Sequence, residues 1–218
     1  MNRRSLLRNG ALSTAALLAI PLSTKAAGQC STATKTPPQT SGPFYPVLDQ
    51  MDTDSDLIRI YGASDIAKGK IVIVEGIVTD QMCKPVMGAL VEIWQACESG
   101  RYNHPSDPNT AELDPNFQYW GKATSDHEGK YKFRTIVPGA YPADASWVRP
   151  PHIHFKIARL GYVELITQMY FTGESLNAKD LVLQRLTKSD QAKVIVDFKQ
   201  VQNVPHLVGQ FNIQIEKV

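Results

Sequence analysis

Two histidines separated by a single residue are the strongest chemical signal in this chain of 218 residues. His152 and His154 follow two prolines and begin a run of strand-forming residues that continues to Ala158. On an extended strand, side chains two positions apart project from the same face. Both imidazoles can therefore reach one metal ion, and the two prolines stiffen the backbone that leads to them.

Two tyrosines in separate turns can complete such a site. Tyr102 follows a Gly-Arg pair, and Tyr141 lies in a turn that begins with Pro138-Gly139. A phenolate is a hard anionic donor that suits ferric iron, whereas zinc and copper sites more often use imidazole and thiolate. Taken one at a time, these residues have plainer interpretations, as strand histidines and as tyrosines that cap a core. Together, two phenols and two imidazoles predict a site for ferric iron.

The rest of the chain has the pattern of an all-β protein. Runs of β-branched and aromatic residues recur at regular spacing with turn residues between them, which is typical of a β-sandwich. One short peripheral helix is predicted around Asn177 to Leu186, with Asn177 as its N-cap and Asp180 in its first turn. The predicted architecture is an immunoglobulin- or prealbumin-like sandwich. Its predicted strands are 71–79, 89–96, 119–124, 130–135, 153–158, 163–170, 192–198 and 211–216, with a tight link at 127–129.

Length and composition favour one domain with a full core. Hydrophobic residues make up 43% of the chain, an ordinary value for a globular protein. Lys and Arg number 23 against 21 Asp and Glu, so the charge balance does not indicate nucleic acid as a partner. The predicted organisation is an export signal at 1–27, an extended N-terminal arm at 28–69 and a sandwich domain at 70–218.

The first 27 residues predict export from the cytoplasm. The pair Arg3-Arg4 precedes Leu6-Leu7 and an apolar stretch from Ala11 to Leu22, which resembles a bacterial twin-arginine signal peptide. That stretch is shorter than the roughly 20 residues of a membrane span. We therefore expect cleavage near Ala27 and a periplasmic product without stable membrane insertion.

Three cysteines follow the predicted signal, Cys30, Cys83 and Cys97. One disulfide with one thiol left over is consistent with this number in an oxidising compartment. Direct pairing of Cys83 with Cys97 is disfavoured, because one is predicted in a turn and the other at the far end of the following strand. Cys30 bonded to one of the other two is favoured. No Cys-x-x-Cys occurs, so a thiolate metal site has no support.

Five sequence motifs occur in an order that is shared with a known enzyme family. They are Gly100-Arg101-Tyr102-x-His104, Leu113-Asp114-Pro115-Asn116-Phe117, Phe133-Arg134-Thr135-Ile136-x-Pro138-Gly139-x-Tyr141-Pro142, Arg149-Pro150-Pro151-His152-x-His154-Phe155 and Leu165-Ile166-Thr167-Gln168-Met169-Tyr170-Phe171. In these motifs the chain resembles the intradiol ring-cleavage dioxygenases, most of all the iron-binding β chains of the protocatechuate 3,4-dioxygenases. The resemblance implies a β-sandwich, in agreement with the strand pattern.

The resemblance also implies a role for each candidate residue. By motif, a solvent hydroxide and four side chains hold ferric iron, Fe(3+): Tyr102, Tyr141, His152 and His154. Arg149 corresponds to an arginine that lies over the bound ring, where a fixed positive charge stabilises developing negative charge. Gln168 corresponds to a pocket glutamine beside it. His104 is either an outer hydrogen-bond partner of the site or a surface residue.

The implied activity is that of a non-haem ferric dioxygenase with two small partners, a catechol and O2. The catechol binds as a chelating dianion, and the tyrosine that corresponds to Tyr141 is displaced and takes one of its protons. The ring opens between its two hydroxyl-bearing carbons, and both atoms of O2 end in a muconate-type diacid. The protein supplies ligand geometry, charge placement and exclusion of water.

Two departures from the family pattern leave the substrate open. Ala143-Asp144-Ala145 stands where the protocatechuate enzymes usually carry a tryptophan and a longer loop. Those enzymes also build their site from two different chains. This chain need not have such a partner, and a homo-oligomer is also possible. The helical region that catechol 1,2-dioxygenases carry near the N-terminus has no room before Thr40, which disfavours that class.

Two alternatives from other classes remain at the level of sequence. One is a non-catalytic transthyretin-like or carbohydrate-binding sandwich without iron. The other is a periplasmic zinc or copper protein that uses His152 and His154 alone, in which the tyrosines have no role.

Overall fold

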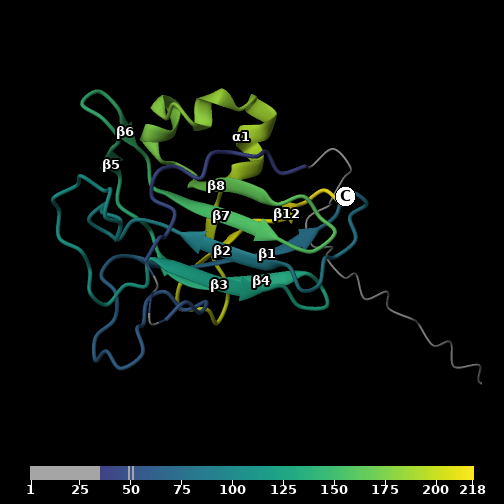
Figure 1. The fold of residues 1–218 in the computed structure, drawn as a ribbon, viewed down its shortest axis with the longest axis horizontal. Coiled ribbons are helices and arrows are strands. Elements are labelled where there is room, and N and C mark those ends of the chain that lie inside the picture. The colour runs from purple at the N-terminus through teal and green to yellow at the C-terminus, as the bar shows by residue number, and fades with distance from the viewer. Residues whose placement is uncertain (1–34, 49, 51) are drawn as a thin grey trace, which may run out of the picture.

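Two five-stranded sheets form the body of the protein in the computed structural model, which describes residues 35–48, 50 and 52–218. The predicted export signal and Cys30 lie outside these residues. A separate two-stranded ribbon, β5 (Tyr141–Pro142) and β6 (Val148–Arg149), stands beside the sheets. Figure 1 shows the sheets with a helical segment covering one side of β8 (Leu165–Phe171).

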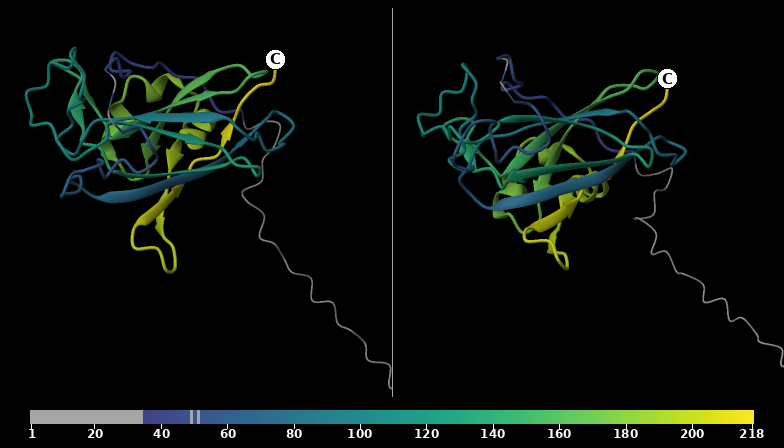
Figure 2. Two further views of the ribbon diagram at one scale, coloured as in Figure 1. Left: turned by 60° about the horizontal axis from the view of Figure 1, so that its bottom comes forward. Right: turned by 90° about the horizontal axis from the view of Figure 1, so that it is seen from below.

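The first sheet is organised around its longest strand, β1 (Ile71–Thr79). One edge of β1 pairs antiparallel with β4 (Lys130–Ile136), and the other pairs parallel with β11 (Leu207–Gln210) and then β12 (Ile213–Gln214). The outermost strand, β10 (Phe198–Gln200), forms a hairpin with β11 that projects from the body of the molecule in Figure 2.

The second sheet carries the His-x-His motif on a central strand. Its order is β3 (Trp120–Thr124), β2 (Leu90–Trp94), β7 (His152–Ala158), β8 and β9 (Ile195–Val196). All neighbours are antiparallel except β8 and β9. Pro150 and Pro151 come immediately before β7, so they remove no backbone hydrogen bond from this central strand.

The apolar core lies between the two sheets and confirms the predicted sandwich. Side chains alternate along β4, where Tyr131 and Phe133 are buried and Lys130 and Lys132 are exposed. This period of two is the one expected of a half-buried strand. We call the inter-sheet cluster the sandwich core; it includes Val74, Ile93, Phe133, Phe155, Ile157, Met169 and Phe211.

Most predicted strands agree with the structure to within two residues at each end, but the C-terminal third differs. The predicted strand 192–198 begins inside α1 (Lys188–Val194) and is divided between β9 and β10. The strand β11 and the ribbon of β5 and β6 were not predicted. These strands are short and lack a clear apolar alternation, so the pattern carries little signal there.

The predicted helix at Asn177 to Leu186 is wrong in type and position. That segment forms two 3-10 turns, η1 (Ser175–Lys179) and η2 (Leu183–Arg185), and the α-helix follows with Thr187 as its N-cap. Asn177 is not the N-cap, since Glu174 caps η1. Asp180 adopts an extended backbone between the two turns, and its carboxylate accepts hydrogen bonds from the amides of residues 182 and 183.

The arm before β1 contains no regular strand over its described residues, 35–48, 50 and 52–69. Its first part lies against β8, where the amide of Gln39 donates to the carbonyl of Ile166 at 2.8 Å. In the described part of the chain, no helix is long and apolar enough to cross a membrane.

The cysteines agree with the prediction that a direct pair of Cys83 and Cys97 is disfavoured. Cys83 is disulfide-bonded, and Cys97 is a free, buried thiol. Cys83 lies in the turn after β1, where it has a positive φ of 61°.

Candidate metal centre

His152 and His154 are both buried and project from the same face of β7, as the sequence predicts. Their ring centroids are 4.9 Å apart. On β2, Trp94 pairs with His154, and the indole stacks on the imidazole with centroids 4.8 Å apart and an interplanar angle of 9°. The strand pair therefore fixes the plane of the second imidazole.

Tyr102 and Tyr141 come from two loops that meet beside these histidines. A Cβ at Gly100 would lie 2.4 Å from the carbonyl oxygen of Ala140, so only glycine permits the approach of the two loops. The tyrosine rings are 5.5 Å apart. The hydroxyl of Tyr102 lies 3.3 Å from Nε2 of His152, and the Tyr141 ring lies 5.7 Å from the His152 ring.

The four predicted ligand residues are thus brought together in a cluster of aromatic rings. We call it the ring cluster. Phe44 of the arm closes it from one side, with its ring 4.8 Å from that of Tyr102 and 6.2 Å from that of Tyr141. The ring cluster contains Phe44, Trp94, Tyr102, Tyr141, His152 and His154.

The hydrogen bonds of His152 define its tautomer, and Tyr102 and Arg149 both point at the lone pair on its Nε2. Nδ1 of His152 lies 2.7 Å from the carbonyl oxygen of Pro150, which can only accept, so Nδ1 carries the proton and Nε2 keeps a lone pair. Nδ1 of His154 is buried and has no hydrogen-bond partner among the described residues. Burial, with Arg149 nearby, lowers the pKa of His152. Burial, then His152 and Arg149, lowers the pKa of His154. Both rings are therefore neutral, the form that binds metals.

Burial has the opposite effect on the tyrosines. It raises the pKa of Tyr102, which the neighbouring Tyr141 raises further, and it also raises the pKa of Tyr141. Arg149 partly offsets both shifts. Without a further cation the two phenols stay protonated, so a ferric ion fits this donor set because its charge would stabilise both phenolates.

Arg149 lies next to the ring cluster on β6 and is 4% exposed. Its Nη1 donates to Nε2 of His152 at 3.0 Å, and its Nη2 donates to Oε1 of Gln168 at 2.8 Å. Gln168 faces His154 across the pair of β7 and β8. The structure therefore places all the predicted site residues in one buried layer.

Asp180 and Tyr170 belong to the same layer, and the sequence analysis assigned neither to the site. Nε of Arg149 donates to Asp180 at 2.9 Å, and the carboxylate is fully buried. The hydroxyl of Tyr170 accepts from Arg149 at 3.2 Å and donates to Gln39 at 3.1 Å. Tyr170 stands two residues after Gln168 on β8, so its shared face was a usable signal. Asp180 lies in an irregular segment, where spacing gives none.

His104 is half-buried rather than fully exposed. Its Nδ1 accepts from the amide of Ser106 at 3.1 Å, and its ring lies 5.7 Å from that of Phe44. No group of three His, Cys, Asp or Glu side chains suited to a metal ion occurs within residues 35–48, 50 and 52–218. The candidate set depends on phenols instead.

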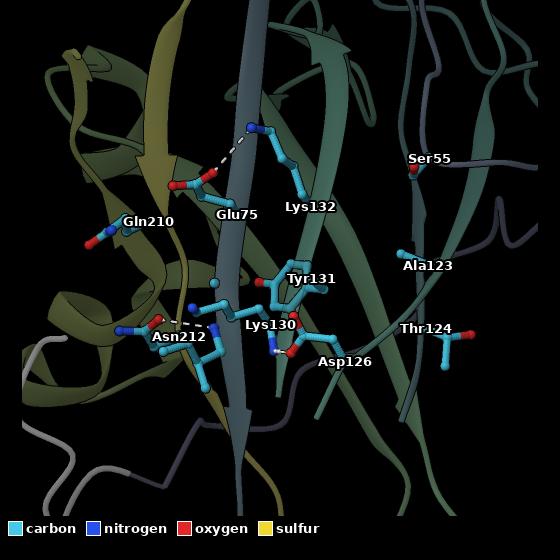
Figure 3. Close-up of a pocket in the computed structure, with 12 residues that line it drawn as sticks. Ser55, Glu75, Ala123, Thr124, Asp126, Lys130, Tyr131, Lys132, Gln210 and Asn212 are labelled. Atoms are coloured by element: carbon cyan, nitrogen blue, oxygen red, sulfur yellow. Dashed lines mark hydrogen bonds and ion pairs between the residues drawn. The ribbon is translucent and has the colours of Figure 1, made fainter. Parts of the chain in front are cut away.

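A hollow of about 660 Å³ lies away from these residues. It runs along β1 and β4 and is lined by charged side chains that have partners, such as Lys132 with Glu75 at 3.6 Å (Figure 3). The chemistry of the ring cluster, rather than the size of a hollow, identifies the candidate site.

Similarity to known proteins agrees with this assignment. Residues 40–216 match the protein family described as Dioxygenase. The chain is 40% identical over 160 residues to the protocatechuate 3,4-dioxygenase beta chain of Burkholderia cepacia, covering 72% of this chain and 68% of that one.

Two solved structures are also similar. An intradiol ring-cleavage dioxygenase from Tetranychus urticae has a TM-score of 0.66 at 25% identity, covering 86% of this chain and 95% of that one. The dioxygenase domain of a carbohydrate-binding fusion from Streptomyces sp. SirexAA-E has a TM-score of 0.63 at 27% identity, covering 84% and 99%. The chain belongs to the intradiol ring-cleavage dioxygenases, which open a catechol-type ring between its two hydroxyl-bearing carbons.

Proposed function

We propose that this chain is a ferric, non-haem dioxygenase whose iron is held by the four ring residues Tyr102, Tyr141, His152 and His154. The observation that carries the proposal is the convergence of two buried phenols with two neutral imidazoles. When bound, ferric iron supplies the Lewis acidity and the electron-accepting capacity that make a chelated catechol reactive toward O2.

The side chains of the site have separable tasks in this proposal. Tyr102 donates toward Nε2 of His152, so its phenol and that imidazole already point at one position. Tyr141 pairs with Arg149 at the end of the ribbon away from its turn, and as a phenolate it can accept a proton from a catechol hydroxyl. Its pKa, raised by burial, makes the phenolate a strong base.

Arg149 provides a fixed positive charge against the bound ring. Burial opposes that charge, but the hydrogen bond to Asp180 and the fields of Tyr170 and Tyr141 raise the pKa of the guanidinium, so it stays protonated. Gln168 accepts from the same guanidinium and limits its rotation. A charge held in place before reaction costs no reorganisation when negative charge develops on the ring.

Visible absorption of the purified, iron-loaded protein tests the ligand set. Charge transfer from tyrosinate to ferric iron is expected to make the protein reddish, and Tyr102→Phe is expected to weaken the band and the retention of iron. Tyr131→Phe is the matched control, because Tyr131 is equally buried but its hydroxyl donates to the carbonyl of Phe211 in the sandwich core. A colourless protein that binds zinc or copper instead would contradict the proposal.

Oxygen consumption and product spectra test the reaction. We expect one O2 consumed per catechol and an absorbing muconate-type diacid as product. A yellow ring-cleavage aldehyde would indicate opening outside the two hydroxyl-bearing carbons and would contradict the assignment.

We also propose that the chain is exported to the periplasm after cleavage near Ala27, with an arm at 28–69 and one catalytic sandwich at 70–218. The paired arginines and the apolar stretch after them support this proposal. Replacing Arg3 and Arg4 by lysine is expected to retain the protein in the cytoplasm of the producing cell, as measured by fractionation.

A further inference from the structure

The indole N–H of Trp147 is a buried hydrogen-bond donor without a partner among the described residues. Buried polar groups in proteins almost always have a partner, since leaving one unpaired costs about 1–3 kcal/mol. The indole ring itself is only half-buried, so one edge of Trp147 faces the interior while the rest borders solvent. That orientation is the one needed by a residue at the wall of a binding site.

Trp147 comes immediately before β6, at the end of the turn that joins it to β5, and these two strands carry Arg149 and Tyr141 of the candidate site. Arg149 pairs with Tyr141 across the ribbon, and the carbonyl of Trp147 accepts from the amide of Ala143 at 2.8 Å. The guanidinium carbon of Arg149 lies 5.4 Å from the centroid of the indole.

Arg149 thus lies between the indole and the histidines, since its Nη1 contacts His152 and its guanidinium lies near the indole. The residue bonded to Trp147 across the turn is Ala143, whose side chain is small and exposed. A ring held over Arg149 would extend its far substituent toward the indole.

The charges around Trp147 favour an uncharged group there. The positive charge of Arg149 is already matched by the carboxylate of Asp180 at 2.9 Å. Asp144, in the turn of the same ribbon, is exposed, and its carboxylate accepts from Ser146. With Arg149 matched by Asp180, a carboxylate substituent would lack a counter-charge beside Trp147, whereas a neutral oxygen could accept from the indole N–H without an unpaired charge.

We infer that Trp147 is a specificity-determining residue that donates a hydrogen bond to a neutral oxygen substituent of the catechol ring. The substrate class is thus catechols with an alkoxy or hydroxyl group on the side remote from the two reacting hydroxyls. This inference rests on the proposed function, because it concerns the same site.

Paired substrates that differ in one atom test the inference. 4-Methoxycatechol and 4-ethylcatechol have nearly the same shape, but only the first has an oxygen acceptor. One neutral hydrogen bond corresponds to a preference of up to about tenfold in kcat/KM. Trp147→Phe keeps an aromatic ring beside Arg149 and removes the N–H, so the ratio of kcat/KM for the two substrates is expected to fall by up to about tenfold. Differences in the intrinsic reactivity of the two rings cancel when one protein is compared with the other.

Trp120→Phe is the matched control. Its indole N–H is bonded to Glu92 at 2.9 Å and is not free to bind a substrate, so its loss is expected to leave the substrate ratio unchanged. Dissociation constants of both catechols, measured on the iron-loaded proteins without oxygen, provide a second readout that does not depend on turnover. The Trp147→Phe change is expected to weaken binding of the methoxy compound only.

The outcomes separate the inference from the proposed function. An unchanged ratio in Trp147→Phe, with catechol itself still cleaved, would overturn the role of Trp147 alone. Preference of the parent enzyme for protocatechuate over 4-methoxycatechol would overturn the assignment of a neutral substituent. Failure of the parent enzyme to cleave any catechol would overturn the proposed function and this inference with it.

Discussion

The sandwich core and the ring cluster are both buried, but they are built on opposite principles. The sandwich core is supplied by strands whose apolar residues alternate with polar ones, and its main side chains have no polar atoms to satisfy. The ring cluster combines residues of two loops and a ribbon with residues of the strands β2 and β7, and it buries phenols, imidazoles and an indole. The first arrangement stabilises the fold, and the second keeps donor atoms available.

The two regions also differ in buried polar atoms that lack a hydrogen-bond partner. The ring cluster contains Nε1 of Trp94 and Nδ1 of His154, both buried and without a partner among the described residues. Such atoms reduce stability, and proteins retain them mainly where a bound group or a reaction uses them. Burial alone therefore does not separate structural residues from functional ones. Whether a buried polar atom has a hydrogen-bond partner is more informative.

The largest effect is expected from His152→Ala in the ring cluster. Removing the imidazole on which Tyr102 and Arg149 converge is expected to reduce ring cleavage on the order of 10³-fold or more, and to reduce iron retention. Oxygen uptake and iron content measure both. His127→Ala, in the exposed turn between β3 and β4, is the control and is expected to have no effect. Unchanged uptake in His152→Ala would place the chemistry elsewhere.

Phe133→Ala makes the corresponding change in the sandwich core. The side chain is fully buried between the sheets, so its loss is expected to lower the free energy of unfolding by about 3–5 kcal/mol. Activity per folded molecule is expected to stay within a few-fold of the parent enzyme. Urea unfolding followed by fluorescence gives the first quantity, and turnover at low temperature gives the second. Loss of activity in the folded fraction would mean that the two regions are not separable.

Asp180→Asn tests the boundary between the two regions. The substitution keeps the shape of the side chain but removes the charge that holds the guanidinium of Arg149 at 2.9 Å. A small misplacement of a catalytic group can cost about 100-fold in rate, so we expect kcat to fall by roughly 10- to 100-fold with little change in KM. A purely structural role would instead lower the amount of folded enzyme at unchanged kcat. Asp190→Asn, in the half-buried pair with Lys193 on α1, is the control.

The sandwich could be predicted from sequence because its strands show an apolar residue at every second position and are rich in β-branched and aromatic residues. The strand 71–79 was predicted to the residue, and the turn at 127–129 has Gly129 at a positive φ of 74°. The helical segment was not predictable in the same way. Asp180 looks like a first-turn residue in sequence, but its carboxylate is bound by Arg149 from β6, a contact that local propensity cannot reveal.

Some residues of the candidate site could likewise be predicted from sequence, and others could not. His152 and His154 follow from strand geometry, and the tyrosines follow from ordered motifs. Tyr170 could have been found in the same way, since it shares a strand face with Gln168. Asp180 and Trp147 lie outside the strands, and their part in the site depends on which segments meet in space. The approach of the arm to His154 is a similar case, since Gly42 lies 112 residues before it in the sequence.

The smallest effect is expected from Gly42→Ala, which adds one methyl group to the wall of the ring cluster. Gly42 has a φ of +67°, and a Cβ there would lie 3.3 Å from Cε1 of His154. Gly161→Ala is a close comparison, because Gly161 has a φ of +84° and open space around its Cβ position. Both substitutions are expected to lower the free energy of unfolding by about 1–2 kcal/mol through backbone strain. Only Gly42→Ala also pushes on the imidazole, so only it is expected to weaken iron retention, by about tenfold at most. Equal iron retention in the two variants would show that His154 tolerates displacement, and that the stacked indole of Trp94, rather than the arm, fixes the ring.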